Sequence, residues 1–355
     1  MGKKMKFAKE DIDLISSKLQ DELSKKIFND RVLFSETSDY RYIKNIVCSF
    51  DEGKALVGRI QQSEKIAIFG AGAVGKQIES IFHDRISCFI DNNKVGNYLG
   101  IPVVSLEEYI ESKSETDIYV CSKFAHEEII QQLLERGISE SRIINVGLEY
   151  SRLNHKQYFD LPALKEYQLH EEIFVDGGGF DGSTSLDFYD WFNASTDAND
   201  GAKSIYDIKI FSYIWEPDGN NIKKINKKLG GKIDYKIIEK GMWDKATVLK
   251  FRMNGTSDST ISDDGDVEIS VDTIDNMCDL RPTFIKMDIE GAEYKALIGS
   301  KKTIEMKKPK LAISIYHNPE DIVKLPKLIL MINPDYKLWM RHYSFGENET
   351  VLYAL

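Results

Sequence analysis

A glycine-rich loop bordered by two carboxylates stands out in this sequence of 355 residues as a segment suited to chemistry. It follows the apolar run Ile173–Val175, which is typical of a buried strand. Glycines let a backbone approach a ligand closely, and acidic side chains repel a diphosphate but attract a sulfonium with its amino group. We therefore expect a cationic cofactor to be bound by Asp176, Gly177, Gly178, Gly179, Asp181, Gly182 and Ser183.

Two further segments follow strand-like runs and supply groups suited to a nucleoside. Glu216 ends the run Phe211–Trp215, and an acid at this edge of a parallel sheet can accept hydrogen bonds from two ribose hydroxyls. Trp243 and its neighbours offer an apolar slot and an acceptor for an adenine, although a tryptophan alone often serves core packing. The expected nucleoside contacts are Glu216, Pro217, Gly241, Met242, Trp243 and Asp244.

Together these segments resemble the FkbM family of S-adenosylmethionine-dependent methyltransferases. The resemblance covers roughly residues 171–355, and its most specific part is the string IKMDIEGAE at Ile285–Glu293. The other matching strings are Asp176–Gly179, Glu216–Pro217, Gly241–Asp244 and Ser270–Asp275. The resemblance implies S-adenosylmethionine as cofactor and O-methylation of a hydroxyl, commonly in polysaccharide, glycolipid or natural-product pathways. The expected acceptor is therefore a sugar, a nucleotide-sugar or a glycan precursor.

Asp288, Glu290 and His317 are the candidate catalytic residues. Asp288 and His317 each follow a strand-like run, so both are expected at the carboxyl edge of the sheet. Methyl transfer needs an aligned nucleophile and an outlet for its proton, which these groups can provide as orienting group or general base. A lone histidine is as readily structural. Lys286 precedes Asp288 by two residues and is expected on the same face as its ion-pair partner.

The same three side chains suggest a less favoured alternative, since carboxylates and an imidazole also suit a divalent cation such as magnesium or manganese. Arg341 and His342, near the last strands, are candidate contacts to an anionic acceptor, with a solvated sheet edge as the alternative.

A second glycine loop, Gly70–Gly75, lies between a strand-like run and a helical segment. Its spacing suits a diphosphate at a helix N-terminus, with Asp91 on a ribose or sugar hydroxyl. Residues 65–147 are similar to Rossmann domains associated with nucleotide-sugars. We expect a nucleotide or nucleotide-sugar site, and keep hydride chemistry and a structural turn as alternatives; its residues are Gly70, Gly72, Val74, Gly75 and Asp91.

The order of elements predicts an α/β protein with two Rossmann-like domains. Strand-like and helical segments alternate twice, and the last strands have the antiparallel pattern that a class I methyltransferase fold requires. We expect a helical extension over residues 1–62, which could mediate a homodimer or pack on a later domain. A small parallel-sheet domain follows over 63–150, and the methyltransferase domain covers 151–355.

The composition limits the range of functions. A net charge of -10 argues against nucleic acid or an anionic membrane as partner. We find no signal-peptide h-region and no apolar run of the roughly 20 residues needed to span a bilayer. The four cysteines, Cys48, Cys88, Cys121 and Cys278, lack CxxC spacing, so the sequence favours a reducing cytoplasm over a zinc cluster or disulfide framework.

Two rival functions are consistent with parts of this pattern. The first is a nucleotide-sugar oxidoreductase or epimerase that uses the Gly70 loop, although a Tyr-x-x-x-Lys pair is missing after that domain. The second is a non-enzymatic module that binds the cofactor without transferring a methyl group.

Overall fold

The computed structural model describes residues 6–197, 209–252, 260–261, 267–277 and 281–355. The chain forms two compact units, each of which joins segments distant in sequence. The C-terminal unit comprises Met1–Lys25, Tyr158–Arg341 and Thr350–Leu355, and the N-terminal unit comprises Lys26–Gln157 and His342–Glu349. These units differ from the contiguous segments expected from the sequence, because each takes in residues from the other end of the chain.

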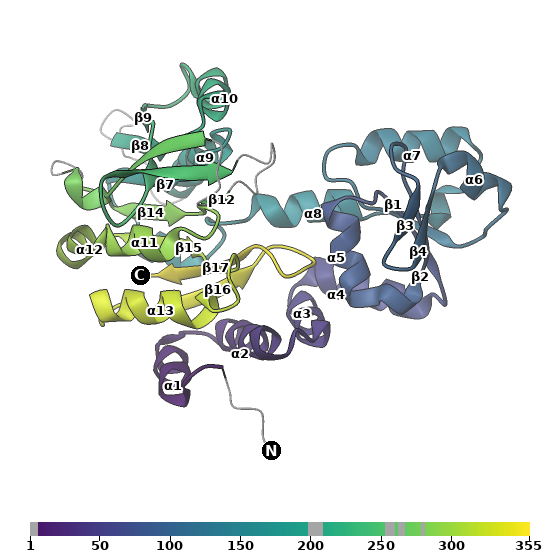
Figure 1. Ribbon diagram of the computed structural model, residues 1–355, viewed down its shortest axis with the longest axis horizontal. Helices are drawn as coiled ribbons and strands as arrows, with labels where there is room; N and C mark the ends of the chain where they lie inside the picture. Colours follow the sequence, from purple (N-terminus) through teal and green to yellow (C-terminus); the bar gives the residue numbers. More distant parts are fainter. Residues whose placement is uncertain (1–5, 198–208, 253–259, 262–266, 278–280) are drawn as a thin grey trace. The chain divides into compact units, whose positions relative to one another are not determined.

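The N-terminal unit contains a six-stranded sheet (Figure 1) in the order β3-β4-β2-β1-β5-β6. All neighbouring strands are parallel except β3 and β4, which form an antiparallel pair. The strands are β1 (Ile66–Phe69), β2 (Ile86–Ile90), β3 (Gly96–Tyr98), β4 (Ile101–Val104), β5 (Asp117–Val120) and β6 (Ile143–Asn145). The following helices are α5 (Ala73–Phe82), α6 (Leu106–Glu111), α7 (His126–Glu135) and α8 (Val146–His155). The sheet order changes direction between β1 and β5.

Helices occupy most of residues 9–62, but they do not form one separate arm. The helices are α1 (Lys9–Lys18), α2 (Glu22–Thr37), α3 (Tyr40–Val47) and α4 (Asp51–Gln62). In the C-terminal unit, α1 packs on α13 (Asp321–Ile332), and Lys327 forms an ion pair with Asp11 at 2.8 Å. Helices α3 and α4 belong to the N-terminal unit, while α2 contributes residues to both. A homodimer through these helices stays a prediction.

The C-terminal unit contains a seven-stranded sheet (Figure 1) in the order β16-β17-β15-β14-β7-β8-β9. The strands are β7 (Glu171–Gly177), β8 (Lys209–Trp215), β9 (Tyr235–Ile238), β14 (Phe284–Met287), β15 (Lys310–Ser314), β16 (Leu338–His342) and β17 (Thr350–Ala354). From β9 to β15 the neighbours are parallel, whereas β17 is antiparallel to β15. The remaining helices are α9 (Ser183–Asp197), α10 (Gly219–Leu229), α11 (Glu293–Ile298) and α12 (Lys301–Lys307).

The strand order alone indicates where a candidate site lies in this sheet. The chain runs outward from β7 to β8 and β9, then returns to β14 on the other side of β7 and continues to β15. In open parallel sheets, ligands bind outside the carboxyl ends of the strands at this change of direction. The loops that follow β7 and β14 therefore border the expected crevice.

A smaller sheet carries the segment around Trp243. Its order is β10-β13-β11-β12, formed by β10 (Gly241–Met242), β11 (Thr247–Arg252), β12 (Thr260–Ile261) and β13 (Val267–Asp272). Strands β11 and β13 pair antiparallel, which agrees with the hairpin-like pattern expected for these segments.

The core beneath β7 and β14 is aromatic. Phe174 and Phe188 stack with ring centroids 4.3 Å apart, and Phe284 meets both rings edge to face. Such pairs contribute roughly 0.5–1.5 kcal/mol beyond the burial of their area. These contacts fix the two strands whose ends carry the candidate site.

Three of the four cysteines lie among the described residues. Cys121 is buried and Cys88 is half-buried, and neither these two nor Cys48 forms a disulfide among the described residues; Cys278 lies outside them. In the part of the chain that the structure describes, no helix has both the length and the apolar character needed to cross a bilayer.

Candidate active site

The glycine loop after β7 packs directly against the loop after β14. Gly178 has a positive φ of 80°, and a Cβ atom there would lie 2.0 Å from the carbonyl oxygen of Asp288. Only glycine fits this close approach. Added Cβ atoms at Gly177 and Gly179 would also lie within 3 Å of neighbouring side chains. The contacts of the loop with the protein itself thus explain these glycines without a ligand.

Asp176 is buried and paired within the protein. Its side chain is 0% exposed, and it accepts hydrogen bonds from Lys286 Nζ at 3.0 Å and from Ser185 Oγ at 2.9 Å. Lys286 also donates to the carbonyl oxygens of Gly177 and Gly178, at 3.0 and 2.9 Å. The expected partner of Lys286 was Asp288, so that pairing is corrected: the lysine extends to the neighbouring strand β7 rather than staying beside its own strand.

Asp181, the second acid of the loop, is also paired. It forms an ion pair with Lys228 of α10, which holds the pKa of Asp181 below its usual value against the effect of burial, and the same lysine reaches Ser183 Oγ. From the sequence, both loop carboxylates are expected to be charges available to a ligand. In the structure each is matched by a lysine, so neither loop carboxylate presents an unmatched charge to a ligand.

Glu216 follows β8 and holds the glycine loop in place. Its Oε2 accepts from the Phe180 amide and its Oε1 from the Asp218 amide, both at 2.9 Å. Burial raises the pKa of Glu216 despite these bonds. Phe180 has a left-handed φ of 48°, and the residue is 49% exposed. A carboxylate offers about four acceptor sites, so Glu216 retains capacity for a ligand hydroxyl. Pro217 follows it.

The segment Gly241–Asp244 lies beside the same loop. Met242 is buried, and its sulfur would be 2.7 Å from a Cβ atom at Gly177. The half-buried Trp243 has the Lys295 ammonium 5.7 Å from its ring centroid, and Lys295 pairs with Asp244 at 2.6 Å. The arrangement brings Met242 to the glycine loop, while the cofactor contacts of this segment, including the adenine role of Trp243 and Asp244, stay a prediction.

Asp288 is held by two tyrosine hydroxyls. Tyr158 donates to its Oδ2 at 2.8 Å, and Tyr316 donates to its Oδ1 at 3.1 Å. Burial alone would raise the pKa of Asp288, but the charges of Lys286 and His317 and the two hydroxyls outweigh burial and lower it. Asp288 is thus an ionised, oriented carboxylate and a weak proton acceptor.

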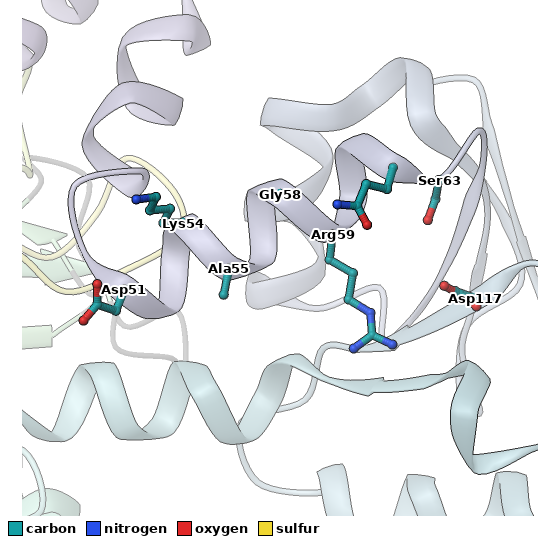
Figure 2. Close-up of a pocket in the computed structure, with 8 residues that line it drawn as sticks. Asp51, Lys54, Ala55, Gly58, Arg59, Ser63 and Asp117 are labelled. Atoms are coloured by element: carbon teal, nitrogen blue, oxygen red, sulfur yellow. The ribbon is translucent and has the colours of Figure 1, made fainter.

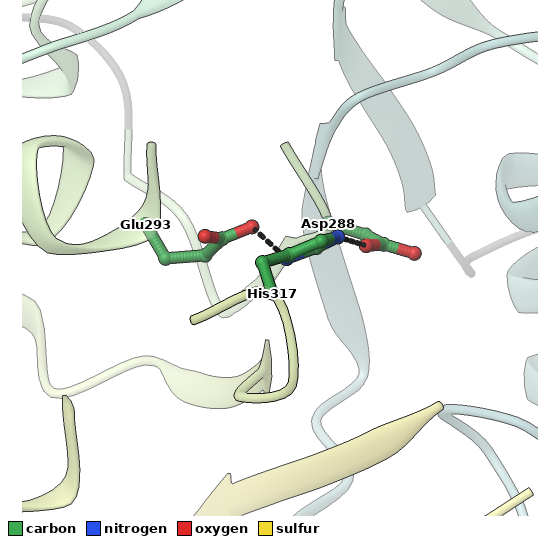
Figure 3. A group of neighbouring side chains, drawn as sticks. All are labelled: Asp288, Glu293 and His317. Carbon is green, nitrogen blue, oxygen red and sulfur yellow. Dashed lines mark ion pairs between the residues drawn. The ribbon is translucent and has the colours of Figure 1, made fainter. Parts of the chain in front are cut away.

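The ring of His317 lies between carboxylates. Figure 3 shows Glu293 on one side and Asp288 on the other. Nδ1 is 3.1 Å from Glu293 Oε1, and Nε2 is 3.4 Å from oxygens of both Asp288 and Glu290. Burial would lower the pKa of His317, but Glu290, Glu293 and Asp288 outweigh burial and raise it to about 11. The imidazole is therefore a cation at neutral pH, which does not suit it to be the general base.

Glu290 is the better proton acceptor of the group. Burial raises its pKa, with Asp288 and Glu293 adding to the effect, and its side chain is 33% exposed. Its backbone is left-handed, with φ 56°, and strained residues of this kind gather at functional sites. The described cluster that could hold a metal ion is Asp288, Glu293 and His317 rather than the expected trio with Glu290. Because the ring separates the two carboxylates, this geometry suits a bridging imidazolium better than a shared ion.

Arg341 and His342 do not join this cluster. Arg341 forms an ion pair with Asp21 at 2.7 Å and also donates to Ser24. His342 is buried in the N-terminal unit, where burial and the charge of Arg31 lower its pKa to about 3. Their role toward an acceptor stays a prediction without a supporting contact.

Four residues of the site were not predicted from the sequence, or were predicted with other partners: Glu293, Tyr316, Tyr158 and Lys286. Glu293 belongs to the string IKMDIEGAE, but its position in the sequence does not show that it reaches His317. Tyr316 is next to His317 in the sequence, and this position could have indicated that it belongs to the site. Tyr158 carries no signal, since it precedes Asp288 by 130 residues. The structural role of Lys286 depends on a strand pairing that sequence spacing does not reveal.

In the N-terminal unit, the carboxylate of Asp91 binds backbone amides of the glycine loop and of its own segment. Asp91 accepts from the Ala71 amide at 2.9 Å and from the Asn93 and Lys94 amides at 2.9 and 3.0 Å. A Cβ atom at Gly75 would lie 2.1 Å from the Gly70 carbonyl oxygen, which explains that glycine by close packing. Gly72 precedes α5, and Val74 is buried within it. The predicted nucleotide contacts stay a prediction.

An open hollow in this unit lies at the opposite edge of its sheet. Its lining side chains, shown in Figure 2, come from α4 and from the start of β5; they are Asp51, Lys54, Ala55, Gly58, Arg59, Gln62, Ser63 and Asp117. Asp117 begins β5, whereas the Gly70 loop follows the end of the parallel strand β1. The hollow is therefore distinct from the expected nucleotide site.

Comparison with known proteins identifies the class of the C-terminal unit. Residues 178–345 match the model of the methyltransferase FkbM domain, and residues 62–144 match a model described as C2185-like, N-terminal. The mixed α/β fold with parallel-rich sheets agrees with the first match. The chain is an S-adenosylmethionine-dependent methyltransferase, and its match to the FkbM domain model is confined to residues 178–345.

Solved structures of low sequence identity are also similar. Methyltransferase FkbM from Methylobacillus flagellatus KT is 18% identical with a TM-score of 0.49, and the match covers 94% of this chain and 99% of that chain. Aeropyrum pernix fibrillarin with bound S-adenosyl-L-methionine is 10% identical with a TM-score of 0.34, covering 57% of this chain and 76% of that one. No curated protein matches the chain.

Proposed function

We propose that this methyltransferase transfers the methyl group of S-adenosylmethionine to a hydroxyl of a sugar, nucleotide-sugar or glycan precursor. The new bond joins the acceptor oxygen to the methyl carbon as the carbon–sulfur bond breaks, so S-adenosylhomocysteine and one proton are released. The observation that carries this proposal is Glu290, a partly exposed carboxylate with a raised pKa beside the fixed Asp288 at the change of sheet direction.

The proposed roles follow from these environments. Glu290 accepts the proton of the acceptor hydroxyl and releases it to solvent, because it combines exposure with a raised pKa. Asp288 orients the acceptor, and the His317 cation balances the surrounding carboxylates. Glu216 and the loop Gly177–Ser183 hold the cofactor, with Asp176 supporting that loop from beneath rather than by direct contact.

We also propose that the N-terminal unit is a second Rossmann-like domain that binds a nucleotide or nucleotide-sugar at the Gly70 loop. The change of sheet direction between β1 and β5 supports this assignment, since the loop follows β1 at that point. Equilibrium dialysis with a radiolabelled nucleotide-sugar tests it, and Gly72→Asp should abolish binding by placing a negative charge in the loop.

Transfer of a tritiated methyl group tests the reaction. The full chain is incubated with labelled S-adenosylmethionine and the glycan and nucleotide-sugar fractions of a cell extract. A hydroxyl acceptor yields a methyl ether, which survives mild alkali, whereas a carboxyl acceptor yields an ester, which does not. Label that is lost in alkali, or absent from both fractions, would contradict the proposed acceptor class.

Glu216→Gln is expected to weaken S-adenosylmethionine binding roughly 10- to 100-fold, because hydrogen bonds to charged groups contribute about 1.5–3 kcal/mol. The side-chain NH₂ group of glutamine would also face one of the two backbone N–H groups that now donate to Glu216, so two donors would oppose each other. Isothermal titration calorimetry measures the change, with the exposed Glu166→Gln as control. Equal affinity in the two variants would remove Glu216 from the cofactor site.

A further inference from the structure

Tyr158 lies ahead of the matched region 178–345 and yet reaches the candidate site. It is buried, and its backbone is left-handed with φ 74°. A non-glycine residue adopts this conformation only where its surroundings impose it. Phe180 and Glu290, the other two left-handed residues of this region, belong to the loops after β7 and β14. Tyr158 is thus a third left-handed residue whose segment reaches the candidate site.

The hydroxyl of Tyr158 engages the candidate catalytic carboxylate. It lies 2.8 Å from Asp288 Oδ2 and 3.3 Å from Ser314 Oγ at the end of β15. Since Tyr316 occupies Oδ1 of Asp288, the two phenols hold the two carboxylate oxygens separately. This arrangement fixes the rotation of the carboxylate, which one hydrogen bond alone would leave free.

The ring of Tyr158 lies beside Lys286. Its centroid is 5.5 Å from the ammonium of Lys286, within the range of a cation–π contact. Lys286 in turn donates to Asp176 and to the carbonyl oxygens of the glycine loop. One side chain therefore contacts both the acceptor-side carboxylate and the lysine that shapes the cofactor loop.

We propose that Tyr158 is a positioning residue of the methyl-transfer site: its hydroxyl sets the orientation of Asp288, and its ring confines Lys286 beneath the glycine loop. The proposal rests on the function proposed above. In this proposal, a residue outside the matched domain helps to align the acceptor with the cofactor. The rate of methyl transfer depends on that alignment.

Tyr158→Phe separates the two contacts, because it removes the hydroxyl and keeps the ring. We expect the rate of methyl transfer to the extract fractions at saturating cofactor to fall about 10- to 100-fold, while KM for S-adenosylmethionine stays within about twofold. Tyr316→Phe is the matched control for loss of a phenol on the other oxygen. Tyr158→Leu removes the ring as well and should also weaken cofactor binding.

A double-mutant cycle shows whether Tyr158 acts through Asp288. In an Asp288→Asn background, Tyr158→Phe should change the residual rate by less than about twofold. A full loss in both backgrounds, or a wild-type rate in Tyr158→Phe alone, would overturn the proposal. Transfer by the wild-type chain tests the proposed function separately, since it can succeed when either of these results goes against Tyr158.

Hydrogen exchange supplies a result that does not depend on an acceptor. The amides of residues 288–291 should exchange about tenfold faster in Tyr158→Phe than in the wild type, because the loop loses its tie to Tyr158. Amides in β8 serve as the internal control and should be unchanged. Unaltered exchange at 288–291 would show that Tyr158 does not position this loop.

Discussion

Lys286→Met is expected to lower the free energy of unfolding of the C-terminal unit by about 3–5 kcal/mol, because it leaves the Asp176 carboxylate buried without its counter-charge. Both side chains are almost completely buried, at 3% and 0% exposed. Methionine also removes the donor that satisfies the carbonyl oxygens of Gly177 and Gly178. Urea titration followed by tryptophan fluorescence measures the loss, and cofactor affinity should fall with it because the glycine loop loses its support.

Two controls separate this buried pair from an ordinary ion pair. Lys301 pairs with Glu305 at 3.8 Å with both side chains exposed, so Lys301→Met should cost no more than about 1 kcal/mol. Asp176→Asn combined with Lys286→Met should be less destabilised than Lys286→Met alone, because no unpaired charge remains. A double variant that loses the sum of both single effects would show that the pair is not the cause.

The order of strands and helices follows from the sequence because each element has a distinct local pattern. The apolar run at Ile173–Val175 leads into a glycine loop, and the Ile285–Asp288 segment ends in an acid, so both strand ends were expected at one edge. The extents of the two units did not follow. Residues 342–349 join the N-terminal unit and residues 1–25 join the C-terminal one, and such long-range packing leaves no periodic pattern in sequence.

Burial of charge explains why the site itself was only partly foreseen. Asp176 is one acidic residue in a loop when seen in sequence, and its lysine partner lies 110 residues away on the adjacent strand. The opposite error occurred at His317. Its position after β15 suggested a base, but three carboxylates, including the unforeseen Glu293, make it a cation. Residue types and strand ends can be inferred locally, whereas charge states depend on neighbours that only the fold brings together.

Asp288→Asn is expected to lower the turnover rate by roughly 100-fold or more while changing the dissociation constant of S-adenosylmethionine by less than about threefold. Loss of the group that aligns a reactant can cost on the order of 10²-fold in rate, because the displacement depends on that alignment. The amide has nearly the same size as the carboxylate and retains one acceptor for Tyr158 or Tyr316, so the fold should tolerate it. What it lacks is the negative charge that Lys286 and His317 now stabilise.

The exposed Asp335→Asn is the matched control, since its carboxylate is 77% exposed and pairs only with the surface residue Lys308 among the described side chains. Its turnover should equal that of the wild type. Normal turnover in Asp288→Asn would remove Asp288 from the mechanism, and a large loss of cofactor affinity would make it a cofactor ligand instead. A selective loss of turnover would assign the fixed charge of Asp288 to the acceptor side. In the proposed mechanism this carboxylate, held ionised by Lys286, His317 and two phenols, orients the hydroxyl, and the more basic Glu290 takes the proton.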